Sequence, residues 1–326
     1  MRGLGSNQWR SIPRPATLYY EAWYVQALGV RSAPPFTSRR ASRDNRERAK
    51  DARMAFTWTA AVGLVALGFG VGAFGTLVGA GGGFILTPIL LLLYPDDSPQ
   101  TLTAISLTAV FFNAASGSVA YFRQRRTDYR SGLAFALATL PGAIGGALVV
   151  QTVSRKPFDA AVAGVLGVIG VWLLAGERFP LRAPPGGRQR RLVDREGHEY
   201  AYRVALWRGV AFSLVVGFVS SFLGIGGGVV HVPVLVSVLG FPTHVATATS
   251  HFVLAIMSGA ATVTHALSGS FHGGHGLRRA AALSIGVVVG AQLGARISLR
   301  TRGRIIELLL AAALLGLAAR LLVGLL

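Results

Sequence analysis

Long apolar blocks alternate with short polar connections through most of the chain. The blocks cover about 56–94, 101–122, 132–150, 157–175, 204–240, 245–268, 280–297 and 305–326. A transmembrane helix needs about 20 apolar residues, so six of the blocks predict simple spans. The blocks 56–94 and 204–240 are interrupted by glycines, and each predicts a broken helix with one net crossing. The pattern therefore predicts an all-α polytopic membrane protein with eight net crossings.

The distribution of basic residues predicts how these crossings are oriented. With one crossing per interrupted block, residues 1–53, 123–130, 176–203 and 269–279 share one side, with 24 basic residues against 6 on the other. The positive-inside rule makes the basic side cytoplasmic. We therefore expect a multi-pass protein of the cytoplasmic (inner) membrane with both termini in the cytoplasm.

An Arg-rich leader precedes the first apolar block. It lacks the charged segment followed at once by an apolar core that marks a signal peptide. Two interpretations stay open, a disordered cytoplasmic extension and a translation start at Met54. The predicted organisation is a leader at 1–53, a first transmembrane repeat at 54–175, a cytoplasmic linker at 176–203 and a second repeat at 204–326.

The two interrupted blocks are copies of one another. Residues 72–88, GAFGTLVGAGGGFILTP, align without a gap on 217–233, GFVSSFLGIGGGVVHVP. Further along, an offset of 144 aligns Ser106 with Ser250 and Gly142 with Gly286. Because four crossings is an even number, we expect two parallel repeats related by a pseudo-two-fold axis along the membrane normal. Paired glycine-interrupted segments in repeated halves indicate a transporter's binding site.

The same segments carry a family resemblance. The pair GAGGGFILTP and GIGGGVVHVP, with ATATSHFVLAIMSGAATVTHALSG after the second, resembles the TauE/SafE sulfite exporter family over about residues 60–325. Each glycine run is followed by a proline five residues after its last glycine. The resemblance implies a transporter of small sulfur-containing or carbon oxyanions, such as sulfite or a sulfonate.

The glycine breaks themselves favour anion binding. Helices that restart near Phe84 and Val229 leave their first N–H groups unpaired and carry a partial positive charge there. Glycine lets an anion approach such backbone closely, and 54–122 and 209–277 contain no basic residue. Tight helix packing is the alternative role for these glycines. The candidate substrate-binding residues are Gly81, Gly82, Gly83, Thr87, Ser106, Gly226, Gly227, Gly228, His231 and Ser250.

Polar residues inside the apolar blocks have competing interpretations. Thr, Ser and His near the breaks could contact substrate, but hydroxyls in membrane helices more often bond the carbonyl four residues before them. For Asn113 and Gln292 we expect interhelical hydrogen bonds. His231 is the first candidate for a proton site and His251 the second, with a neutral histidine bonded between helices as the alternative for both.

Composition excludes several classes of function. Apolar residues make up 52% of the chain and charged residues 14%, which is unlike a soluble enzyme. The net charge of +19 lies outside the apolar blocks, so it is an orientation signal rather than a nucleic-acid footprint. The absence of cysteine excludes thiolate metal sites and disulfides. The sequence has neither paired intramembrane carboxylates nor a Ser–His dyad, so it gives no indication of an enzyme. We also expect no cofactor and no metal.

The predicted partners are a small anion and the lipid bilayer, and a homodimer is compatible with the sequence. A gated anion channel and a transporter of a non-sulfur carboxylate remain alternatives to the oxyanion carrier. The direction of transport is also open. The occurrence of Leu86 at the repeat position of His231 favours anion flow driven by the membrane potential over proton coupling.

Overall fold

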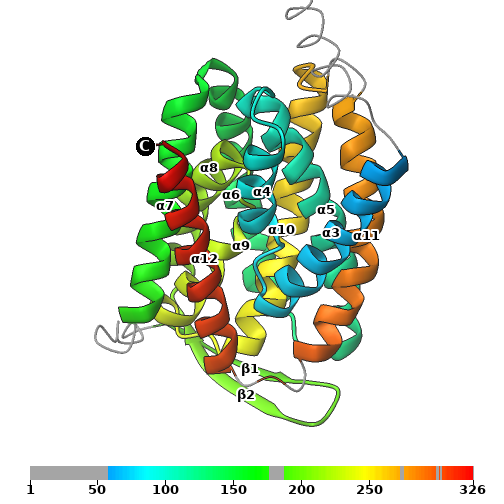
Figure 1. Ribbon diagram of the computed structural model, residues 1–326. Helices are drawn as coiled ribbons and strands as arrows, with labels where there is room; N and C mark the ends of the chain where they lie inside the picture. Colours follow the sequence, from blue (N-terminus) through cyan, green and yellow to red (C-terminus); the bar gives the residue numbers. More distant parts are fainter. Residues whose placement is uncertain (1–57, 176–186, 272–274, 299–300, 302, 326) are drawn as a thin grey trace, which may run out of the picture. The chain divides into compact units, whose positions relative to one another are not determined.

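The computed structural model describes residues 58–175, 187–271, 275–298, 301 and 303–325. Within them the chain is helical apart from one two-stranded hairpin (Figure 1). The leader 1–53 and Met54 lie outside the described residues. The helices are α3 (Trp58–Val78), α4 (Gly83–Leu93), α5 (Pro99–Gln124), α6 (Tyr129–Val149), α7 (Arg155–Ala175), α8 (Leu206–Leu223), α9 (Gly228–Pro233), α10 (Thr243–Leu267), α11 (His275–Ser298) and α12 (Gly303–Leu325).

Four shorter elements complete the described chain. A 3₁₀ turn η1 (Val150–Thr152) follows α6, and a π-helical turn η2 (Val234–Val238) continues α9. Strands β1 (Arg188–Val193) and β2 (Glu199–Val204) pair antiparallel between α7 and α8. Seven of the described helices are long and apolar enough to cross a membrane, which confirms an all-α polytopic membrane protein.

Ion pairs and hydrogen bonds show which connections lie at the same end of the helices. At one end, Arg279 of α11 pairs with Asp97 in the α4–α5 connection, and Arg155 of α7 donates to the Leu91 carbonyl of α4. At the other end, Arg126 of the α5–α6 turn pairs with Asp194 of the hairpin. We call the second the hairpin end; it lies at the bottom of Figure 1.

Close helix pairs fix the direction of α3 and α8. In α3, Gly68 lies against the Leu283 backbone and Gly72 against Val287, so α3 runs in the same direction as α11. It therefore begins opposite the hairpin, and α4 returns to that end. In the second half, Gly142 of α6 lies against the Leu214 carbonyl and Gly146 against Phe218, so α8 runs with α6, away from the hairpin.

These directions correct the predicted topology. Each interrupted block enters and returns, so the prediction of one net crossing per block is wrong. Each half then has three net crossings and not four, and the corresponding helices α5 and α10 run in opposite directions, so the predicted parallel arrangement is wrong too. The reason is conformational: Gly79, Gly81 and Gly82 have φ of 79°, 72° and 80°, and this left-handed backbone reverses the chain where the prediction assumed a brief interruption.

The predicted grouping of connections is corrected in the same way. The start of α11 shares an end with Asp97 and not with 123–130, whereas Arg296 near the end of α11 lies at the hairpin end, where the Gln124 amide donates to the Ala295 carbonyl. The described ends Trp58 and Leu325 both lie opposite the hairpin. The shared side predicted for the termini and the Arg-rich connections is therefore wrong.

The internal alignment also shifts by one helical turn in its later part. Gly142 lies against the carbonyl of Leu214, whereas the carbonyl of Phe69, at the repeat position of Leu214, lies against Gly290. Gly142 thus corresponds to Gly290 and not to Gly286. The sequence could not separate the two because these glycines recur every four residues, close to one turn of helix.

Candidate functional site

The two glycine breaks meet backbone to backbone. A methyl group on Gly83 would lie 2.6 Å from the carbonyl carbon and oxygen of Ile225. A methyl group on Gly228 would lie 2.6 Å from Cα of Ala80 and would overlap the Gly79 carbonyl. The structure therefore brings together the predicted residues of both breaks, which are 145 positions apart in sequence.

Consecutive buried N–H groups at both breaks lack a protein acceptor. Hydrogen bonding resumes at Ile85, which donates to the Gly82 carbonyl, and at Val230, which donates to the Gly227 carbonyl. Buried N–H groups without a partner are rare in native proteins, and each break has a run of them. Among the described residues, the buried N–H groups without a recorded acceptor at the breaks are those of Gly82, Gly83 and Phe84, and of Gly226, Gly227, Gly228 and Val229.

The hydroxyl groups predicted as substrate contacts instead bond carbonyls of the opposite half. Ser106 Oγ donates to the Gly224 carbonyl at 2.7 Å, and Thr87 Oγ1 donates to the same oxygen at 2.6 Å. Ser250 Oγ donates to the Gly79 carbonyl at 3.2 Å. Gly79 and Gly224 each follow the last residue of a helix, where carbonyls lose their partners. These hydroxyls hold the two breaks together in the described conformation.

Apolar side chains cover the breaks. Val110 of α5 approaches both Gly81 and Gly226, with 3.2 Å and 3.0 Å between its methyl carbons and the Cβ positions of the glycines. Leu254 of α10 lies directly on Gly81. Because neither 58–95 nor 209–277 contains a charged residue, the backbone supplies the donors here, and the surroundings exclude water.

His231 lies one turn beyond the second break. Its Nε2 is 3.2 Å from Ser213 Oγ, its ring packs edge-on against Phe135, and its Nδ1 has no hydrogen-bond partner. The structure does not connect His231 to the residues of the first break.

Asn113 and Gln292 form interhelical hydrogen bonds, as predicted. Asn113 Oδ1 accepts from Thr76 Oγ1 at 3.0 Å, and Gln292 Nε2 donates to Ser116 Oγ at 2.8 Å. Thr76 was missed in the sequence because threonine is common in membrane helices. The bond to Asn113 gives it a place beside His251, whose Nε2 lies 3.3 Å from Thr76 Oγ1.

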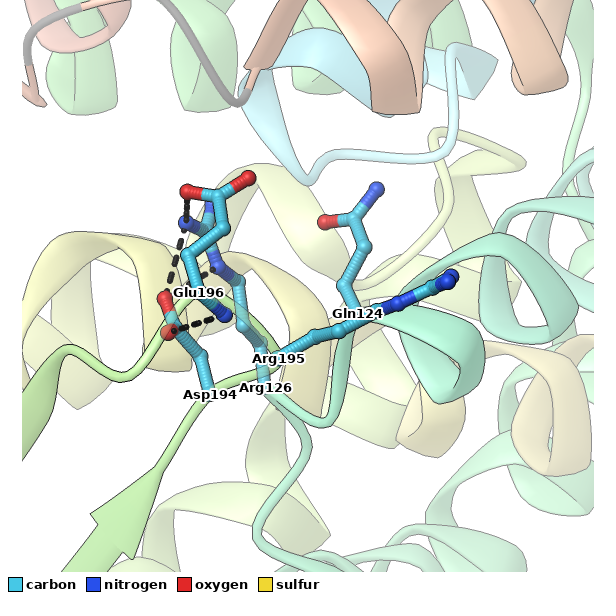
Figure 2. A pocket seen from close by; sticks show the side chains of 5 residues that line it. All are labelled: Gln124, Arg126, Asp194, Arg195 and Glu196. Carbon is cyan, nitrogen blue, oxygen red and sulfur yellow. Dashed lines mark hydrogen bonds and ion pairs between the residues drawn. The ribbon is translucent and has the colours of Figure 1, made fainter.

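A separate cavity of about 300 Å³ lies at the hairpin end (Figure 2). Its wall includes Arg126, whose Nε and Nη2 donate to Asp194 Oδ2 at 3.2 Å and 3.0 Å. Burial alone would raise the pKa of Asp194, but N–H groups of the hairpin turn and the Arg126 guanidinium outweigh it and hold that pKa below its usual value. The remaining lining residues are Gln124, Arg195 and Glu196.

Asp194, Glu196 and His198 lie close enough to hold a metal ion, with ligand atoms within 4.8 Å of one another. However, Asp194 Oδ1 already accepts from the N–H groups of Glu196 and His198, and Oδ2 accepts from Arg126 and Tyr200. A guanidinium at this carboxylate repels a cation, so the donor set does not fit a metal.

A family model described as "Sulfite exporter TauE/SafE" matches residues 64–321, which include both breaks and both halves. The chain belongs to this family. The resemblance seen in GAGGGFILTP and GIGGGVVHVP is thereby confirmed. The TauE/SafE match begins after the leader and after Met54.

Relatives of this TauE/SafE protein are described as transporters. A Bacillus subtilis protein described as "Probable membrane transporter protein YunE" is 32% identical over 76% of this chain and 92% of its own length. A Methanocaldococcus jannaschii protein, "Probable membrane transporter protein MJ0441", is 26% identical over 60% of this chain and 68% of its own length. No solved structure matches. The protein is a multi-pass membrane transporter, and its family and relatives are not described as enzymes.

Proposed function

We propose that this TauE/SafE protein moves a small oxyanion, sulfite or a sulfonate, across the cytoplasmic membrane, and that the anion binds between the two glycine breaks. The observation that carries the proposal is the pair of unpaired buried N–H sets, at Gly82–Phe84 and Gly227–Val229. An oxyanion offers several acceptor oxygens to such donors. The partial positive charge at two helix N-termini supplies attraction without a basic side chain.

The surroundings support an anion that is bound and then released. A site made only of backbone dipoles attracts an anion less strongly than one that contains arginine. Val110 and Leu254 cover the glycines in the described conformation, so binding requires these side chains to move. The printed family description supports a sulfur oxyanion, and a carboxylate presents similar oxygens and is the alternative substrate.

We further propose that the two halves are inverted repeats, related by a pseudo-two-fold axis in the membrane plane. Matching contacts support this: α3 packs on α11 as α8 packs on α6, and Ser250 bonds Gly79 as Ser106 bonds Gly224. Inverted repeats around a central site are typical of alternating-access carriers. They favour a carrier over the gated channel that the sequence left open.

The hairpin end is proposed to face the cytoplasm. Among the described residues, 123–130 contribute four arginines and 188–203 contribute five, whereas the opposite end has Arg155, Lys156, the pair at 278–279 and Arg320. The positive-inside rule then assigns the hairpin end to the cytoplasmic side.

Single cysteines test this orientation, because the chain has no native cysteine. An impermeant thiol reagent should label Ser154→Cys and Ser268→Cys in intact cells and leave Val193→Cys unlabelled; all three positions are exposed. Labelling of Val193→Cys with protection of the other two would reverse the proposed orientation.

Flux of radiolabelled sulfite into liposomes tests the site. Gly227 has a helical φ of −59°, and a methyl group there would meet the flexible Met257 Sδ at 3.1 Å. Gly227→Ala should therefore fold but weaken saturable sulfite uptake. Gly164→Ala in α7 is the matched control, since nothing lies within 4 Å of its Cβ position. Wild-type affinity in Gly227→Ala would contradict binding at the break, and no saturable uptake of sulfite, sulfonate or carboxylate by the wild type would contradict the function.

A further inference from the structure

A buried polar cluster lies beside the first break and has no equivalent beside the second. Thr76 of α3, Asn113 and Tyr121 of α5 and His251 of α10 are each at most 1% exposed. At the repeat positions of Thr76, Asn113 and His251 the chain has Ser221, Met257 and Leu107. The second break forms without an amide at the position of Asn113 and without an imidazole at the position of His251, so building a break does not require these two groups.

Hydrogen bonding in this cluster fixes the tautomer of His251. The single hydroxyl hydrogen of Thr76 goes to Asn113 Oδ1 at 3.0 Å, so Thr76 Oγ1 must accept from His251 Nε2 at 3.3 Å. A neutral imidazole has one N–H, and here it is on Nε2. Nδ1 is therefore left with a lone pair and meets no hydrogen-bond criterion, and the backbone carbonyls of Thr247 and Gly79 lie beside the ring, where they favour its protonated form.

A second unpaired group lies in the same cluster. Asn113 Nδ2, a donor, is buried without a partner. Buried polar groups are normally satisfied, and here one donor and one acceptor are both free. A ligand that carries an anionic oxygen and a hydroxyl group matches this pair, because it can accept from Asn113 and donate to His251.

We infer that His251 Nδ1 is the site at which this transporter binds a proton, with Thr76 and Asn113 as positioning residues. The inference rests on the proposed oxyanion transport. In the step, a protonated oxyanion such as hydrogen sulfite gives up its hydroxyl proton: its O–H bond breaks, an Nδ1–H bond forms, and an imidazolium and a sulfite dianion result. The new positive charge then attracts the dianion, which links anion binding to pH.

The cluster is joined to the first break by short connections. Thr76 lies one turn before Gly79, and Ser250, the neighbour of His251, bonds the Gly79 carbonyl. The absence of a side chain at Gly117 makes room for the ring, since a methyl group there would lie 2.5 Å from His251 Cδ2.

Few titratable groups face the ring. Tyr121 of α5 is the titratable neighbour, with ring centroids 5.4 Å apart, and it also donates to the Thr76 carbonyl at 2.7 Å. Among the described residues of α3, α6 and α11, no charged side chain is recorded in contact with the imidazole. No neighbouring carboxylate offsets the charge of a protonated His251; the carbonyls of Thr247 and Gly79 stabilise it in part, and the transported anion is the available counter-charge.

Liposomes that contain a pH-sensitive dye test the inference with His251→Gln and the control His244→Gln, a partly buried histidine near the start of α10. Sulfite counterflow and internal pH are followed at about pH 6 and about pH 8, on either side of the ordinary histidine pKa of about 6.5. The wild type and His244→Gln should move protons with sulfite and respond to pH. His251→Gln should keep saturable counterflow but lose proton movement and the pH response.

Two further variants test the positioning role without removing the histidine. Thr76→Val removes the acceptor for Nε2–H and should shift the midpoint of the pH profile, and Thr76→Ser should restore it. Proton movement in His251→Gln equal to that of the wild type would overturn the inference. So would wild-type sulfite transport without proton movement, a result that leaves the proposed function intact and needs no variant to fold. Absence of saturable wild-type transport would instead overturn the proposed function, and the inference with it.

Discussion

The break at Gly79–Gly83 and the break at Gly224–Gly228 have similar backbones, except that φ is 80° at Gly82 and −59° at Gly227, and they have different surroundings. Both leave three matching N–H groups unpaired, and each presents a carbonyl to a serine from the other half. Around them the side chains differ. After the first break α4 continues as a regular helix, whereas after the second α9 passes into the π-helical turn η2.

The comparison separates what both halves need from what one half adds. Glycine backbone reverses the chain and exposes N–H groups in both, so these features follow from the shared motif. The polar cluster around His251 lies beside the first break only. The second hydroxyl, from Thr87, bonds a carbonyl of the second break only. In the proposed inverted-repeat carrier, identical halves would make inward- and outward-facing states equal in free energy, and such side-chain differences shift their populations.

The largest expected effect comes from adding a methyl group where the breaks touch. Gly83→Ala and Gly228→Ala would each place Cβ against backbone atoms of the opposite break at 2.6 Å or less. Because backbone cannot move aside as a side chain can, we expect each to lower the free energy of unfolding by more than about 3 kcal/mol. Thermal unfolding in detergent measures this, with Gly164→Ala as control. If only one variant is destabilised, the two breaks are not equivalent in packing.

The turn after α5 provides the next test. The turn after α5 is held to the hairpin by the buried Arg126–Asp194 pair, whose side chains are 4% and 1% exposed. Arg126→Met would leave a buried carboxylate without its cation and should cost about 3–5 kcal/mol. The exposed Arg191–Glu199 pair of the same hairpin is the control, and Arg191→Met should cost less than about 1 kcal/mol. Equal losses of unfolding free energy in Arg126→Met and Arg191→Met would show that the hairpin does not stabilise the first half.

Acid should weaken the same attachment by a smaller amount. The pKa of Asp194 is lower in the folded protein than in an unfolded chain, where it is about 3.9. Its contribution to stability is therefore complete above about pH 4 and is lost as the pH falls through the folded value. Unfolding followed from about pH 7 to pH 3 should show this loss in the wild type and not in Asp194→Asn. A wild-type profile unchanged by Asp194→Asn would contradict the assignment.

The smallest difference concerns the two serines. Ser250 is the recorded side-chain donor to the Gly79 carbonyl, whereas Ser106 shares the Gly224 carbonyl with Thr87. Ser250→Ala should therefore cost about 1–2 kcal/mol and Ser106→Ala less, since Thr87 still donates. The double variant Ser106→Ala/Thr87→Val should match Ser250→Ala. If Ser106→Ala and Ser250→Ala lower the free energy of unfolding equally, the Thr87 hydroxyl contributes nothing at the Gly224 carbonyl.

The sequence predicted the breaks well because glycine runs have one strong conformational consequence. Positive φ is open to glycine at little cost, and Gly79, Gly81, Gly224 and Gly226 all adopt it. Charge counting failed because it assumed that the chain changes sides between the Arg-rich leader and the first polar connection, 95–100. Because α3 and α4 enter and return at the same end, this assumption is wrong. No single residue in the sequence predicts such a return.

The sequence by itself determined that this is a helical membrane protein, where its helices break and to which family it belongs. Hydropathy, glycine conformation and the repeated motif are local properties, so they can be read one segment at a time. The tertiary structure decided the direction of each helix, through the glycine contacts of α3 with α11 and α8 with α6. It also brought Thr76, Asn113 and His251 together from three helices. Such contacts depend on packing between segments up to 175 residues apart, which no periodicity along the chain encodes.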